Sequence, residues 1–229
     1  MKSARVAGIV AVLLAALLPA QPVVAPTPAE IGQAPGTSCG NYNVANTWET
    51  GYRFREVGGS LGKYRSDINY GNGIRLLQGQ LTVNSTDGSG RLFDALVLDT
   101  LGLGDPYQFS SLRIEKNRWY RYQLNYRLSD YFNPGLTLSN GQHLLNTQRR
   151  MQDHDLTLLP QSPVRIVMGS SRVAQDGPAL TTTNFLNHTG DEFPLFADIR
   201  RLRREYRVGS EVQWRWIRAH ILRGWDQFE

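Results

Sequence analysis

Residues 201–216 alternate polar and apolar side chains with a period of two. The odd positions hold Arg, Glu, Gln or Gly, and the even positions are largely apolar or aromatic, with Arg204 and Ser210 as exceptions. Residues two apart share one face of a β-strand, whereas a helix would mix the two sets around its circumference. The pattern therefore predicts a long strand with one polar and one apolar face.

The same alternation occurs over residues 119–128 and, more loosely, over 48–55. Strand-like composition with weaker alternation is found at 74–84, 92–100, 107–115, 154–159 and 164–172. Turn signals rich in Gly, Asn, Asp or Pro separate these segments, including an Asp-Gly-Pro at 176–178. We expect nine or ten strands joined as an antiparallel meander, and hence an all-β fold.

The expected connections alternate in length. Short ones fall at 116–117 and 160–163, and long ones at roughly 130–146 and 173–197. The segment containing Ser60-x-x-Lys63 is interpreted as a hairpin turn. Alternation of short turns and long loops is typical of the two rims of an outer-membrane barrel.

The alternating positions of each strand form an apolar row and a polar row, and the composition of these rows favours a transmembrane β-barrel, or part of one, over a soluble sheet. The apolar rows are rich in Tyr and Trp, which suit the bilayer interface, and the polar rows are rich in Arg with Glu and Gln, which suit a wet lumen. Arg204 lies in the apolar row, so we expect it near a rim, where an arginine costs about 0 to 1 kcal/mol instead of about 2 to 4 at the midplane. The alternative is an exported soluble β-sandwich or barrel that binds a ligand or surface polymer.

The barrel hypothesis assigns two sets of residues. The lumen-lining or partner-contacting set is Arg201, Arg203, Glu205, Arg207, Glu211, Arg215, Arg121 and Arg127. The lipid-facing set is Tyr120, Tyr122, Leu124, Tyr126, Tyr206, Val208, Val212 and Trp214.

The N-terminus has the pattern of a secretory signal peptide. Lys2 and Arg5 precede an apolar run over 6–18 that is followed by Pro19 and Ala20. We expect a signal peptide at 1–20, a Pro-rich linker at 21–46 and the barrel region at 47–229, with the outer membrane as destination and the periplasm or secretion as alternatives. The net charge of +5 falls to +3 without Lys2 and Arg5, which does not indicate a nucleic-acid partner.

No motif in the chain indicates an enzyme. The four histidines lack metal-ligand spacing, Asp153 and Asp155 are expected on one face of a strand, and the phosphate-binding and nucleophile-elbow motifs are missing from the sequence. We therefore expect no catalytic residue, no metal site and no cofactor in this chain.

Several short motifs resemble those of the outer-membrane β-barrels of the porin-cytochrome type, the MtrB/PioB-like group. They are Gly169-Ser170-Ser171-Arg172, Gly177-Pro178, residues 191–196, residues 205–209, Glu49-x-Gly51-Tyr52-Arg53, Gly59 and Lys63-Tyr64-Arg65. The resemblance implies a barrel that contacts outer-membrane lipid and sheathes a periplasmic multihaem cytochrome, with haem only on that partner. Cys39 stands alone where some members carry a pair, and the shorter length implies an N-terminal part of a longer barrel.

Overall fold

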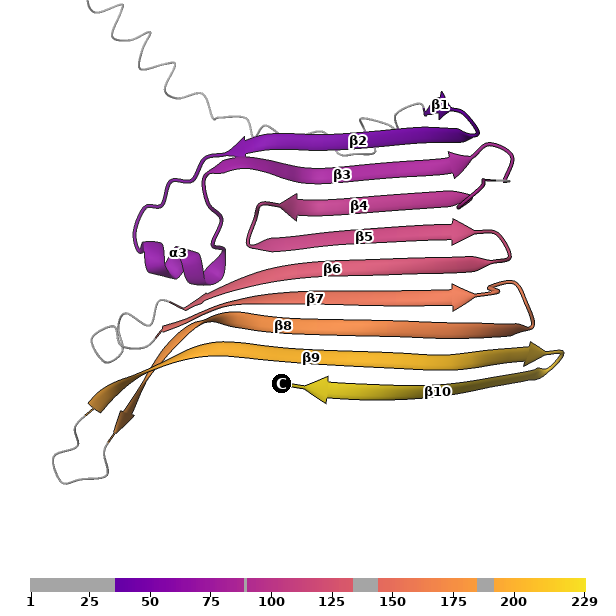
Figure 1. Cartoon of the computed structure of the whole chain (residues 1–229). Helices are drawn as coiled ribbons and strands as arrows, with labels where there is room; N and C mark the ends of the chain where they lie inside the picture. Colours follow the sequence, from indigo (N-terminus) through magenta and orange to yellow (C-terminus); the bar gives the residue numbers. More distant parts are fainter. Residues whose placement is uncertain (1–35, 89, 134–143, 185–191) are drawn as a thin grey trace, which may run out of the picture. The chain divides into compact units, whose positions relative to one another are not determined.

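A computed structural model describes residues 36–88, 90–133, 144–184 and 192–229. These residues form one ten-stranded antiparallel sheet in which neighbours in sequence are neighbours in space (Figure 1). The strands are β1 Thr37–Cys39, β2 Tyr42–Arg53, β3 Gly73–Ser85, β4 Ala95–Leu103, β5 Tyr107–Lys116, β6 Tyr120–Asn133, β7 Leu144–Leu158, β8 Val164–Asn184, β9 Glu192–Trp214 and β10 Ile217–Phe228. The expected all-β meander and its number of strands are confirmed.

The sheet is open across the described residues. β1 and β10 lie at opposite edges, and neither pairs with the other in the described part of the chain. β1 covers only residues 42–44 of β2, so most of β2 also lies along an edge. The predicted signal peptide and the first part of the linker lie outside the described residues, and strand structure begins at Thr37, inside the range expected for the linker.

The prediction of a long connection over residues 173–197 is wrong. β8 runs to Asn184 and β9 starts at Glu192, so residues 185–191 alone connect them. Gly177 has a φ of 148°, and a Cβ there would lie 2.2 Å from the carbonyl oxygen of Asn146. Gly177 therefore allows β7 and β8 to approach closely at this point. Pro178 lies within β8, although the turn signal at 176–178 had predicted that the strand would end there.

Ser60 begins a helix instead of a hairpin turn, which corrects the expectation for this segment. The Ser60 hydroxyl accepts a hydrogen bond of 3.3 Å from the backbone N–H of Lys63, as an N-cap does, and α3 follows over Leu61–Asp67. The Arg65 guanidinium lies 3.6 Å from the centre of the Phe132 ring, which ties α3 to β6.

Connections differ between the two ends of the sheet (Figure 1). The short turns 117–119, 159–163 and 215–216 lie at one end. The connection 54–72 lies at the other end, where β6 ends at Asn133, β7 begins at Leu144, β8 ends at Asn184 and β9 begins at Glu192. Two connections do not follow this separation of short from long: 86–94 is long and lies at the end with the short turns, and 104–106 is short and lies at the opposite end. Arg215 and Trp216, which the alternation had placed in a strand, form the tight turn between β9 and β10, with Arg215 at a φ of 51°.

The register separates the side chains into two faces. Directly opposed residues in an antiparallel ladder project from the same face. The ladder pairs therefore place one row across the sheet, made of Leu81, Leu98, Leu112, Leu124, His154, Ser170, Tyr206 and Trp225. We call the side that carries this row the apolar face and the opposite side the polar face.

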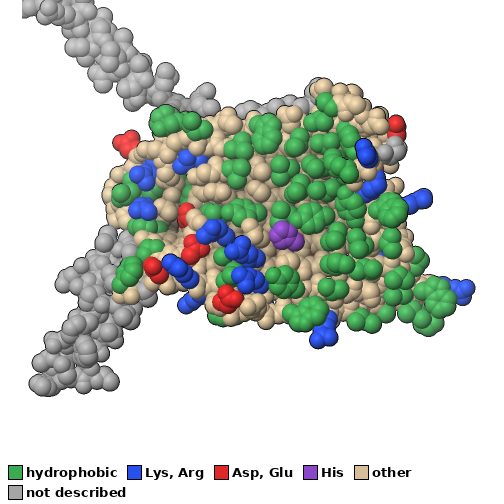
Figure 2. Space-filling model, viewed as in Figure 1, with side chains coloured by type: hydrophobic (Ala, Val, Ile, Leu, Met, Phe, Trp, Pro, Cys, Tyr) green, Lys and Arg blue, Asp and Glu red, His purple; other side chains and the backbone are tan. Residues whose placement is uncertain are grey.

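Nothing covers the apolar face within the described residues. Figure 2 shows hydrophobic side chains spread over the strands on the face in view, with a group of charged side chains near one end. No hydrophobic residue of the described part is fully buried, and Tyr206 and Trp214 remain 49% and 62% exposed. The fold therefore lacks, in its described residues, the second layer that forms the core of a sandwich.

Candidate functional site

The polar face gathers the residues expected to line a lumen. The ladder pairs place Arg201, Arg203, Glu205, Arg207 and Glu211 of β9 on this face, and those same pairs continue to Arg121 and Arg127 of β6. Arg215 differs, because it lies in the turn after β9 with its guanidinium 5.6 Å from the Trp214 ring.

The residues expected to face lipid share the apolar face. Those of β6 are Tyr120, Tyr122, Leu124 and Tyr126, and those of β9 are Tyr206, Val208, Val212 and Trp214. The two sequence-derived sets thus project from opposite sides of one sheet, although the residues come from strands far apart in the chain.

Ion pairs connect β9 to its neighbour β10 on one side and, across β8, to β7 on the other. The Arg203 guanidinium donates to Asp226 of β10, with 2.6 Å between Nη2 and Oδ2, and lies 3.4 Å from Glu205. Arg207 donates to Asp155 of β7 at 2.6 Å and lies 3.8 Å from Glu205. The charges of this part of the polar face therefore largely compensate one another.

Asp153 and Asp155 lie on the same face, as the sequence predicts, but they do not act together. Asp153 accepts a hydrogen bond of 2.6 Å from the Ser171 hydroxyl, whereas Asp155 pairs with Arg207. His154 points to the apolar face, where its Nδ1 shares a hydrogen bond of 2.8 Å with the Tyr122 hydroxyl. Within the described residues no group of three potential ligands is arranged for a metal ion.

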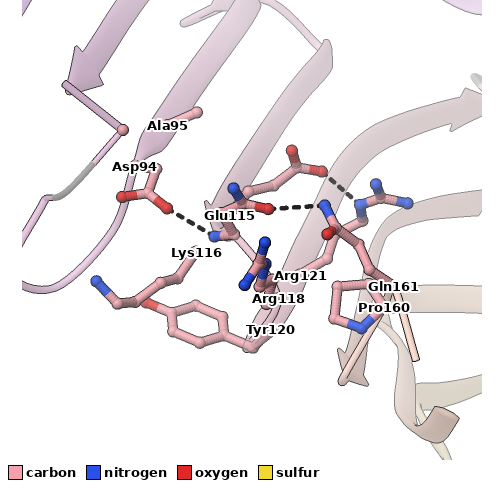
Figure 3. Close-up of a pocket in the computed structure, with 11 residues that line it drawn as sticks. Asp94, Ala95, Glu115, Lys116, Arg118, Tyr120, Arg121, Pro160 and Gln161 are labelled. Carbon is pink, nitrogen blue, oxygen red and sulfur yellow. Dashed lines mark hydrogen bonds and ion pairs between the residues drawn. The ribbon is translucent and has the colours of Figure 1, made fainter. Parts of the chain in front are cut away.

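A second charged cluster lies near the short turns, beside a hollow of about 280 Å³ (Figure 3). The Glu115 carboxylate accepts hydrogen bonds from Arg113 at 2.5 Å and from Arg121. Asp94 fixes the adjacent turn, because its two carboxylate oxygens accept from the backbone N–H groups of Gly90 and Asn117, at 3.0 and 2.7 Å. The carboxylates that frame the hollow, those of Asp94 and Glu115, thus already have protein partners.

A third pair lies further along the polar face. Arg165 of β8 is 3.7 Å from Glu211 and donates to Gln213 at 3.2 Å. The sequence analysis had singled out Glu211 but missed Arg165, Arg113, Glu115 and Asp226. Alternation in β5 and β8 is weak, and only the register between strands brings these residues together.

At the opposite end of the sheet, Asp105 anchors the turn between β4 and β5. This carboxylate is 5% exposed and accepts hydrogen bonds from Arg53 at 2.8 Å and from Arg75 at 2.9 Å. The sequence analysis had named Arg53 only within the motif Glu49-x-Gly51-Tyr52-Arg53, and it had not predicted that Arg53 and Arg75 meet at Asp105.

The described residues define an open antiparallel meander with one uncovered apolar face and one charged face. No family model, no curated protein and no solved structure matches the chain. None of the helices among the described residues is long and apolar enough to cross a bilayer. The conclusions about function below therefore depend on the two faces of the sheet.

Proposed function

We propose that this chain forms wall strands of an outer-membrane β-barrel, with the apolar face against lipid and the polar face against an aqueous interior. The observation that carries the proposal is the division of side chains into two faces, maintained across the sheet while the apolar face stays uncovered. Exposing such an apolar face to water costs free energy, whereas the lipid-facing exterior of a membrane barrel is apolar.

The order of side chains along β9 supports this proposal. Its apolar row starts at Trp214, passes through Val212 and Val208, and reaches Tyr206 before the first charge at Arg204. The eight residue steps from Trp214 to Tyr206 span about 26 Å at roughly 3.3 Å per residue. A barrel exterior carries an apolar band about 25 Å tall between aromatic girdles, and strand tilt shortens the projection of this row somewhat.

The charges on the apolar face also fit a membrane boundary. Arg204 pairs in register with Arg172 of β8, and both lie just beyond the row that contains Tyr206. Further from the short turns, Arg150 and Asp176 form an ion pair of 2.7 Å. On β7, β8 and β9, charges therefore begin where the band of aromatic and aliphatic side chains ends, as expected for a rim. Arg223 of β10 is an exception, because it lies opposite Val208 on the apolar face, inside this band.

The competing function is that of an exported soluble β-domain. A soluble sheet with this apolar face needs a second layer over it, which the described residues do not supply. The decisive experiment expresses the full chain with its N-terminus in a Gram-negative host. We expect recovery in the outer-membrane fraction and faster migration in detergent gels before boiling than after. A protein that stays soluble without detergent and migrates alike in both conditions overturns the proposal.

The interior is proposed to act as a pore or as the sheath of a periplasmic multihaem cytochrome in electron transfer across the outer membrane. The porin-cytochrome resemblance favours the sheath, whereas a polar face lined by Arg201 and Arg203 suits either role. The double charge reversal Arg201→Glu with Arg203→Glu separates them: a change in ion selectivity supports the pore, and loss of a co-purifying haem protein supports the sheath. Unchanged conductance and unchanged co-purification remove both.

A further inference from the structure

Four arginines of the polar face have no ion-pair partner among the described residues. One is Arg218 of β10, beside the 215–216 turn, which donates only to Gln213 at 3.5 Å. The other three lie further from the short turns. They are Arg127 of β6, Arg149 of β7 and Arg201 of β9. The arginines nearer the short turns differ, because Arg113, Arg121, Arg165, Arg203 and Arg207 are all paired with carboxylates. Apart from Arg218, the arginines of the polar face nearer the short turns are therefore compensated within the described part of the chain. Arg149 and Arg201 further along are not, and neither is Arg127, which lies in the same row as Arg203.

The register places Arg149 near both Arg127 and Arg201, whereas Arg127 and Arg201 lie three strands apart, at least about 14 Å at roughly 4.8 Å per strand. Arg149 and Arg201 both lie opposite Gln175 of β8, one on each side, so their backbones are about 10 Å apart at roughly 4.8 Å per strand. Ser129 lies opposite Arg149, and Arg127 is two residues from Ser129, which makes Arg127 and Arg149 diagonal neighbours at about 7 to 8 Å. Long guanidinium side chains at these separations can converge on one ligand.

Two side chains of this arrangement, those of Gln175 and Arg127, are held by contacts with other residues. The Gln175 side-chain amide donates a hydrogen bond of 3.1 Å to the Thr147 hydroxyl, and Thr147 is 5% exposed. The Arg127 guanidinium lies 5.7 Å from the centre of the Phe109 ring. Arg149 and Arg201 are exposed, so their donors are available above the fixed amide.

Among the described residues, carboxylates on the polar face form no ion pair with this group, although Asp153 is a diagonal neighbour of Arg127, which lies opposite Met151. The nearest along the two strands are Asp153, four residues from Arg149, and Glu205, four residues from Arg201, which corresponds to about 13 Å. Asp153 is bound by Ser171, and Glu205 lies near Arg203 and Arg207.

We propose that Arg127, Arg149 and Arg201, arranged around Gln175, bind a multivalent oxyanion such as a phosphate-bearing solute. This inference rests on the proposed aqueous interior and adds the chemical class of its ligand. Guanidinium groups present a planar fork of donors that matches phosphate or carboxylate oxygens in pairs. Three of them without carboxylate partners favour an anion with more than one charge over chloride.

The test uses inorganic pyrophosphate as the probe and the folded full chain in detergent, with binding measured by titration calorimetry. We expect saturable binding that weakens about tenfold in Arg149→Gln and in Arg201→Gln. Arg113→Gln is the matched control, because it removes one positive charge from the same face at a residue already paired with Glu115. Its affinity should stay within about twofold of the original.

Two outcomes overturn the inference: absence of saturable pyrophosphate binding, or an equal loss in all three variants, which indicates general attraction to a basic surface. Arg201→Lys adds a further readout, since it keeps the charge and loses the fork, and we expect an intermediate affinity. Heat-modifiable migration is recorded on the same samples. A chain that inserts without binding pyrophosphate refutes the anion site alone, whereas binding without insertion refutes the membrane proposal.

Discussion

Arg207 of β9 and Asp155 of β7 form an ion pair across the strand between them, with 2.6 Å from Nη2 to Oδ1. Gly169 of β8 lies opposite both residues in the register. A Cβ at position 169 would lie 2.2 Å from Nε of Arg207. The missing side chain at Gly169 is therefore what lets the arginine cross β8.

Gly169→Ala should displace Arg207 and break its pair with Asp155, lowering the free energy of unfolding by about 1 kcal/mol. Denaturant titration followed by tryptophan fluorescence measures the change. Gly224→Ala is the matched control, since a Cβ there meets only the Tyr206 carbonyl oxygen at 3.7 Å. In an Asp155→Asn background the penalty should shrink, and an unchanged penalty would show that the ion pair is not what the glycine permits.

Asp105→Asn should lower the free energy of unfolding by about 2 kcal/mol, because two arginines lose the charge of a nearly buried carboxylate. The same denaturant titration applies. Asp67→Asn is the control, since its pair with Lys63 is exposed and worth about 0.3 kcal/mol. Equal effects of the two substitutions would contradict the anchoring role of Asp105.

Tyr122→Phe should cost about 1 kcal/mol, because it leaves His154 without its hydrogen-bond partner on the apolar face. The double variant Tyr122→Phe with His154→Leu removes both polar groups and should recover most of that loss. Thermal unfolding of the single and double variants provides the comparison. A double variant less stable than Tyr122→Phe would argue against this explanation.

Leu124→Arg and Gln123→Arg form a matched pair for the membrane proposal, since they are adjacent in β6 and project from opposite faces. An arginine at position 124 should reduce insertion into lipid by about 2 to 4 kcal/mol if that position lies near the midplane. An arginine at position 123 should have little effect. The folded fraction in vesicles, measured across a urea series, distinguishes them, and similar losses in both variants would count against a lipid-facing apolar side.

The sequence predicts the strands of this sheet well where alternation is strong, as in β6 and β9, because period two follows directly from strand geometry. It mispredicts Gly177-Pro178, because local turn preference competes with a ladder formed with distant strands. It also places Arg215 in a strand, since a two-residue turn carries the alternation from β9 into β10 without interruption. The Ser60 helix is short and had no apolar period to reveal it.

The candidate site is harder to predict than the strands. Arg201 and Arg207 were identified from their own strand, but their partners depend on register. Asp155 is 52 residues from Arg207, and nothing in either segment specifies that they meet. Pairing of strands far apart in the chain is decided by the whole set of contacts, which no local pattern contains.

The order of the strands carries an arithmetic constraint. β2 and β10 point in the same direction (Figure 1), because β2 to β10 are nine long strands of alternating sense, counted with both ends. A cylinder built only from antiparallel neighbours must contain an even number of strands. Leaving aside the three-residue β1, these nine can be enclosed in such a cylinder only when an odd number of additional full-length strands joins them.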